Sequence, residues 1–152
     1  MLSIHITRMI EDHAEQLAQS LIIDLQGNPH TPEYHKLPQA EIYRRVYDAY
    51  RNLGEWLGQE ADSVVQAHYS ALGRQRALEG VPLSEVVMAL TLTKNHLFNY
   101  VRTSSLFDSA LQLYQLQELR RLVDNFFDKA IYYTVCAYER GAALLVASGT
   151  AR

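Results

Sequence analysis

Two histidines within predicted helices are the residues of this sequence best placed to do chemistry. Each shares a helical face with mostly apolar residues: Val64, Val65 and Leu72 for His68, and Ala89, Leu92 and Tyr100 for His96. An imidazole in a helical bundle can ligate haem or accept a phosphoryl group. A histidine packed in a helical core is the commoner arrangement, so we expect structural roles and keep phosphotransfer and haem binding as alternatives.

An arginine near the end of a predicted helix is the other candidate. Arg74 and Arg76 lie about one turn before Gly80, where a cation complements the negative end of a helix. An arginine close to an apolar face could also hold an acidic ligand. The candidate ligand-binding residues are therefore His68, Arg76, His96 and Tyr100.

The other reactive residue types form no catalytic or metal-binding motif. His30 and His35 lie in a loop, without the cysteine pair or the HExxH spacing of a zinc site. Cys136 has no histidine or lysine within one helical turn to activate its thiol, so we expect it to pack as a small apolar side chain. We therefore expect no catalytic residue, no metal and no cofactor.

The composition is that of one domain with no nucleic-acid or membrane partner. A chain of 152 residues that is 48% hydrophobic can bury one core, so we expect a single domain over residues 1–152. A net charge of −3 and the lack of a basic stripe argue against nucleic acid. No apolar run reaches the roughly 18 residues of a membrane span. The single cysteine and the lack of a secretory signal favour the cytoplasm.

Apolar residues recur at spacings of three and four over most of the chain, which predicts helices. The predicted helices are Ile4–Gln26, Gln39–Leu57, Gln59–Glu79, Ser84–Val101 and Phe107–Val146. The segment Gly27–Pro38 holds three of the four prolines, so it is predicted to be an irregular connection. Because no useful strand alternation occurs, the predicted class is all-α, with about five or six helices and a long last one.

The fourth predicted helix should be central, because Glu85 and Lys94 are its only charged residues and a surface helix carries a wide polar face. Gly80 should end the preceding helix in a left-handed conformation, and Ser84 should cap the first turn of this one. We expect four of its apolar side chains to be buried: Val87, Leu90, Leu97 and Val101.

The last predicted helix carries two apolar lines. The first line consists of Leu119, Val123, Phe126, Ala130 and Tyr133, and the second of Leu122, Phe127, Ile131 and Val135. A small domain can cover only part of so wide a stripe, and an uncovered strip marks an interface. We expect the first line to face the core and the second, with Phe127, to face another copy in a homodimer.

Three segments together resemble a known family: HYSALGRQRALEGVPLSEVVMALTLTKNHL (His68–Leu97), RLVDNFFDKAIYYTVCAYE (Arg121–Glu139) and the early Glu55–Leu57. They are similar to the N-terminal domain of the RsbRD type, from the RsbT co-antagonist family of stressosome sensors. That domain also occurs ahead of some bacterial sensor histidine kinases. The resemblance implies a non-catalytic helical sensor, globin-like or bundle-like and free of haem, and it assigns no ligand.

The function expected from this resemblance is signal sensing and regulation. The domain would transmit a stimulus through its C-terminal helix to a protein partner or to an attached output module, which family members usually carry after this domain. The stimulus itself is not implied. A histidine phosphotransfer domain and a haem-type sensor are the alternatives.

Overall fold

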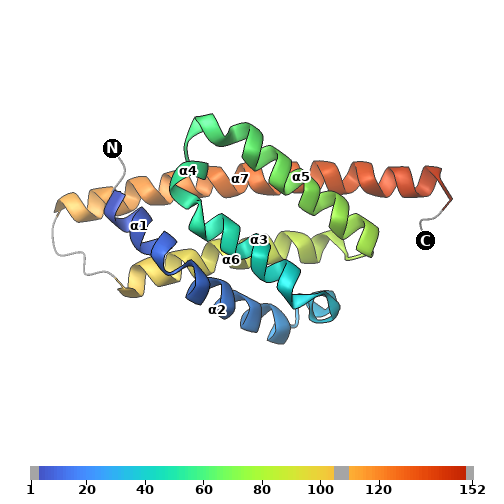
Figure 1. Ribbon diagram of the computed structural model, residues 1–152, viewed down its shortest axis with the longest axis horizontal. Coiled ribbons are helices and arrows are strands. Elements are labelled where there is room, and N and C mark those ends of the chain that lie inside the picture. Colours follow the sequence, from blue (N-terminus) through green and yellow to red (C-terminus); the bar gives the residue numbers. More distant parts are fainter. Residues whose placement is uncertain (1–3, 105–109, 150–152) are drawn as a thin grey trace.

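The computed structural model describes residues 4–104 and 110–149, and most of them are helical (Figure 1). The elements are α1 (Ile4–Asp12), α2 (Ala14–Gly27), η1 (Pro32–Lys36), α3 (Gln39–Arg51), α4 (Leu53–Trp56), η2 (Gln59–Ala61), α5 (Asp62–Glu79), α6 (Leu83–Ser104) and α7 (Ala110–Ala147). Within these two ranges no strand occurs. The predicted all-α class with a long C-terminal helix is therefore confirmed.

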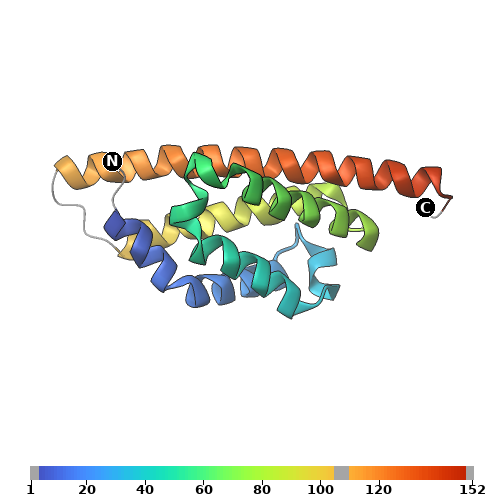
Figure 2. The same ribbon diagram turned by 45° about the horizontal axis from the view of Figure 1, so that its top comes forward.

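Helix α7, of 38 residues, runs along one side of the molecule (Figure 1). Helix α5 lies parallel to α7 and shares the most extensive interhelical contact with it, while α6 runs antiparallel to both. Helices α2 and α3 pack together on the opposite side, with α6 between them and α7 (Figure 2). The central position predicted for α6 is therefore correct.

Two predicted helices are each broken in two by a polar side chain. At His13, between α1 and α2, the ring Nδ1 donates to the carbonyl of Met9 at 2.8 Å. At Asn52, between α3 and α4, the side-chain amide donates to the carbonyl of Asp48 at 2.8 Å. Such bonds to the carbonyl four residues back compete with the helix, and both breaking residues have non-helical backbone angles. The prediction of one continuous helix over Ile4–Gln26 and another over Gln39–Leu57 is therefore wrong.

The turn between α5 and α6 has the predicted glycine but not the predicted cap. Gly80 is left-handed, with φ of 73°, and its N–H donates to Ala77. Helix α6 begins one residue before Ser84, whose side chain is exposed, so the expected N-cap at Ser84 is wrong. The carbonyl of Pro82 accepts the first helical N–H groups instead.

Helix α6 contributes a continuous buried face to the core. Leu90, Leu97 and Val101 are buried as predicted, whereas Val87 is only partly buried. Around this face the core divides into a large cluster with residues of α1, α5 and α7, and a smaller cluster under η1. Tyr50 of α3 is fully buried, and its hydroxyl donates to the carbonyl of Thr93 in α6 at 2.7 Å.

Helices α5 and α7 approach closely because small residues line their contact. A Cβ atom on Gly73 would lie 2.2 Å from the carbonyl oxygen of Thr134 and 3.1 Å from the Cβ of Ala137. One turn further along, a Cβ on Gly141 would lie 3.3 Å from the Cβ of Ala77. Glycine is required at position 73 because the backbone of α7 occupies the space of a side chain.

The first apolar line of α7 faces the body of the molecule, and so does Phe127 of the second line, which corrects the interface prediction for that residue. The first line is buried except for Tyr133, which is partly buried. In the second line Phe127 is only 2% exposed and the other three side chains are partly buried, so Phe127 is a core residue. The strongly exposed apolar side chains of α7 are Leu111, Leu113, Tyr114, Tyr132, Leu144 and Val146. None of the described helices is long and apolar enough to cross a membrane.

Candidate functional site

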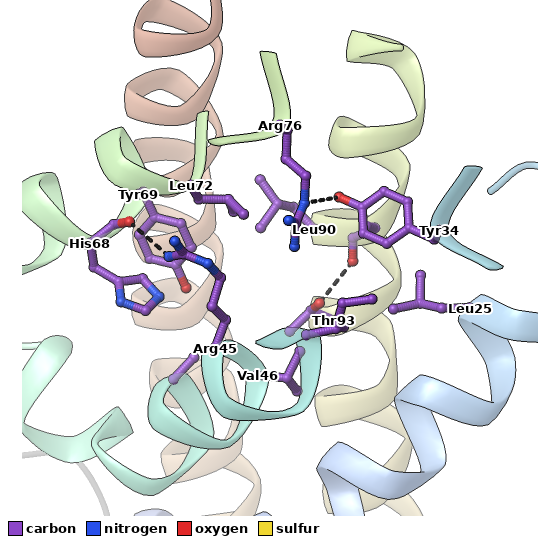
Figure 3. A pocket seen from close by; sticks show the side chains of 13 residues that line it. Leu25, Tyr34, Arg45, Val46, His68, Tyr69, Leu72, Arg76, Leu90 and Thr93 are labelled. Atoms are coloured by element: carbon purple, nitrogen blue, oxygen red, sulfur yellow. Dashed lines mark hydrogen bonds between the residues drawn. The ribbon is translucent and has the colours of Figure 1, made fainter. Parts of the chain in front are cut away.

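The buried arginine of α5 is the centre of the most polar site in the core. Arg76 is 1% exposed, and its guanidinium forms ion pairs with Glu41 of α3 at 2.9 Å and with Glu79 at 2.8 Å. It also lies 5.3 Å from the ring centroid of Tyr34, and its Nε is 3.4 Å from the Tyr34 hydroxyl (Figure 3). One side chain therefore connects α5 with α3 and η1.

A second arginine extends this network. Arg45 pairs with Glu41 one turn earlier on α3, donates to the side-chain oxygen of Gln75 at 2.8 Å, and reaches the carbonyl of His68 at 3.4 Å (Figure 3). Glu41 is thus shared between two guanidinium groups. Two arginines and two glutamates leave no net charge, so an acidic ligand would first have to displace a carboxylate.

The burial of this network shifts its proton equilibria. Burial acts to lower the pKa of Arg76, but Tyr34, Glu41 and Glu79 together outweigh it, so the pKa of Arg76 is raised and the side chain stays charged. Burial also raises the pKa of Tyr34, which Arg76 only partly opposes, so the hydroxyl stays protonated. The site therefore has a fixed charge pattern at neutral pH.

His68 lies at the edge of the same site, in an aromatic cluster. Its ring is 4.9 Å from that of Trp56 and 4.8 Å from that of Tyr69, measured between centroids. Burial, with a smaller effect of the Arg45 charge, lowers the pKa of His68 to about 4. The imidazole is consequently neutral at pH 7 and packs as an aromatic side chain.

A small cavity of about 40 Å³ lies between His68 and Arg76. Most of its lining is apolar, from α2, α3, α5 and α6, with Arg45 at its polar edge. This volume suits about one water molecule, whereas pockets for organic ligands measure roughly 300–1,000 Å³. Haem does not fit the cavity in this conformation. That His68 and Arg76 bind a ligand stays a prediction.

The other two predicted ligand residues lie elsewhere. His96 Nε2 is 2.7 Å from the carboxylate of Asp24 and lowers its pKa by hydrogen bonding, while His96 Nδ1 is 3.5 Å from the Ser20 hydroxyl. The ring of Tyr100 lies 5.6 Å from that of His13. The structure therefore brings His68 and Arg76 together, and it separates both from His96 and Tyr100.

The Ser20, His96 and Asp24 group has the residue types of a hydrolase triad without its surroundings. Ser20 and Asp24 are one turn apart within α2, where backbone N–H groups bond within the helix and cannot form an oxyanion hole. Lys94, two residues before His96 in the chain, pairs with Asp124 at 3.7 Å. We interpret the His96–Asp24 pair as a contact between α2 and α6.

Tyr34, Glu41 and Arg45 belong to the site but were not among its predicted residues. Glu41 and Arg45 are four residues apart on one predicted helix, as is typical of an ion pair, so that signal was present. The pairing of both with α5 is a tertiary contact. Across the described ranges no three His, Cys, Asp or Glu residues are grouped as metal ligands.

The fold and this site define an all-α domain whose core holds a charge-balanced network. The comparison with protein families gives the class of protein. The family model described as "RsbT co-antagonist protein rsbRD N-terminal domain" matches residues 25–152. The chain therefore belongs to the RsbRD N-terminal domain family, a family of signalling regulators, as the resemblance implied. No curated protein and no solved structure matches it.

Proposed function

We propose that this chain is a single, non-catalytic sensory domain of the cytoplasm that passes a conformational change through α7 to a protein partner or an output module. The observation that carries this proposal is the backbone contact between α5 and α7 at Gly73. No flexible side chain separates the two helices there, so a displacement of α5 has to move α7 as well. The family membership supports a regulatory role.

The input side of this pathway is the network between α3 and α5. Glu41 holds Arg76 and Arg45 together, so a shift of α3 changes the position of α5. Helix α7 is also held at the turn after α5, because the Tyr138 hydroxyl donates to the carbonyl of Val81 at 2.6 Å. The network contacts α5, and α5 in turn contacts α7, so the three form one continuous path.

Hydrogen exchange tests this coupling. Glu41→Gln keeps the size of the side chain and removes its charge, so we expect faster amide exchange in α5 and in residues 130–147 of α7. Glu15→Gln, an exposed carboxylate on α2, is the matched control and should change neither helix. Faster exchange confined to α3 and η1 would show that the network is not coupled to α7.

We also propose that α7 forms a homodimer through its solvent-facing side. Tyr114 and Tyr132 are both strongly exposed and about five helical turns apart, so they point in the same direction. Val146, also exposed, lies close to the same face. Exposed apolar side chains along one helix face suit a two-fold interface with a second copy.

Light scattering over a concentration range tests the dimer. We expect twice the mass of one 17.4 kDa chain, and loss of the dimer in Tyr132→Glu with the helical content unchanged. Leu78→Glu, an exposed apolar position on α5, is the control and should remain dimeric. A single-chain mass at high concentration would rule the dimer out.

A further inference from the structure

A second, much larger hollow lies between the C-terminal half of α6 and the first turns of α7. Its volume is about 640 Å³, within the roughly 300–1,000 Å³ of pockets that take small organic ligands. The two helices diverge toward the end of α6 (Figures 1 and 2). The cleft is separate from the Arg76 site, and the two share no lining residue.

The cleft has an apolar part and an amide part. Phe98 of α6 and Leu116 of α7 are partly buried and supply the apolar surface. Exposed side-chain amides, among them Asn99 and Gln117, lie beside them and can donate or accept hydrogen bonds. Such a mixture positions a ligand that is apolar at one end and polar at the other.

Each helix also supplies one arginine to the cleft. Arg120 of α7 lies over the Phe98 ring, 4.9 Å from its centroid, and its Nε is 4.0 Å from the Asp124 carboxylate, at the limit of an ion pair. Arg102 of α6 donates to the amide oxygen of Asn99 at 3.0 Å, and an amide carries no charge to balance it. Among the described residues that line the cleft, none is acidic.

This charge pattern is the opposite of that around Arg76. The core arginines are matched by carboxylates at short distance, whereas the partners of the two cleft arginines among the described residues are a distant carboxylate and an amide. Two guanidinium groups facing a solvent-filled cleft attract an anion, and their planar forks suit carboxylate, sulfonate or phosphate groups.

We propose that the cleft between α6 and α7 binds a small organic anion with a planar apolar body. The anionic group is held by Arg102 and Arg120, and the apolar body packs against Phe98 and Leu116. The ligand thereby joins the end of α6 to the first turns of α7. This site does not depend on the signalling role, because it follows from the cleft alone.

The test uses 8-anilinonaphthalene-1-sulfonate, a planar aromatic anion, and its uncharged relative N-phenyl-1-naphthylamine. We expect saturable fluorescence enhancement with the anion and weaker binding at high salt. Arg102→Gln and Arg120→Gln should each weaken binding of the anion by roughly tenfold, since each removes one charge-assisted contact. Neither substitution should change binding of the uncharged relative.

Two controls distinguish this site from general hydrophobic binding. Arg44→Gln, an exposed arginine on α3, should leave the affinity for the anion unchanged. In amide NMR spectra of the wild-type protein, the anion should shift resonances of residues 95–102 and 116–120 and leave those of α3 in place. Circular dichroism of each arginine variant shows that the fold is retained.

The results that overturn the proposal are equally specific. No saturable binding at millimolar probe, or equal binding of the anion by wild type and the Arg102→Gln, Arg120→Gln double variant, would show that the cleft is not an anion site. Resonance shifts confined to the Arg76 site, or to the side of α7 that carries Tyr132 and Val146, would also show that the anion does not bind in the cleft.

Discussion

The substitution Gly73→Ala isolates the contact between α5 and α7. The added Cβ would meet the Thr134 carbonyl oxygen at 2.2 Å and the Tyr138 amide nitrogen at 2.9 Å, whereas ordinary contacts begin at 3.4 Å. Both atoms belong to the backbone of α7, so no side chain can rotate away. The two helices would have to separate by roughly 1.2 Å at this point.

The expected cost follows from two opposing effects. Overpacking a well-packed contact costs about 1–3 kcal/mol, and a forced shift of backbone belongs at the upper end. Alanine in a helix interior gains about 1 kcal/mol over glycine, which offsets part of that cost. We therefore expect Gly73→Ala to lower the free energy of unfolding by about 2 kcal/mol.

Urea denaturation followed by circular dichroism measures this change. Gly141→Ala is the graded control, because its nearest neighbour is the Cβ of Ala77 at 3.3 Å, and it should cost less than about 1 kcal/mol. Gly27→Ala has nothing within 4 Å and should be neutral or slightly stabilising. If Gly73→Ala were as stable as the wild-type protein, the close approach of α5 and α7 would be refuted.

Four further predictions concern the core. Leu90→Ala should lower the free energy of unfolding by about 2–5 kcal/mol in urea denaturation, and a loss below about 1 kcal/mol would make α6 peripheral. Arg76→Met should cost about 1–3 kcal/mol in the same assay, because it removes the cation that pairs with Glu79 and one of the two cations that pair with Glu41, and a neutral result would contradict the ion pairs. Because the pKa of His68 is lowered on folding, the unfolded chain takes up its proton first, and stability falls as the pH drops from about 6.5 to 4 by on the order of 3 kcal/mol. His68→Gln should lack this loss, and the control His30→Gln should keep it. Phe127→Glu should abolish the cooperative thermal transition, and a folded monomer would place this side chain at an interface after all.

Helix content was predictable along most of this chain because apolar spacing and end signals agree locally. Gly80 stands where the chain needs a left-handed residue, and α6 has too few charges to lie on the surface. The breaks at His13 and Asn52 were missed, because a polar side chain on a helix can face solvent or bond its own backbone, and spacing does not distinguish the two.

The candidate site was only half predictable, for a different reason. His68 and Arg76 were identified by residue type, yet Tyr34 and Glu41 reach Arg76 from segments more than thirty residues earlier in the chain. When two charged residues are so far apart in the chain, whether they pair depends on how whole helices pack. The same reason explains Phe127, which belongs to a second apolar line on α7 but is itself covered by the body of the molecule.

By itself, the sequence determined that the protein is all-α, that α6 is central, that Gly80 closes α5, and that the chain resembles the RsbRD N-terminal family. Each of these depends on residues near one another in the chain, or on a pattern of residue types. Only the tertiary structure decided that Arg76 is neutralised in the core, that Gly73 permits α5 and α7 to touch, and that Arg102 and Arg120 share an open cleft. These features depend on distances between helices, which apolar periodicity leaves undetermined.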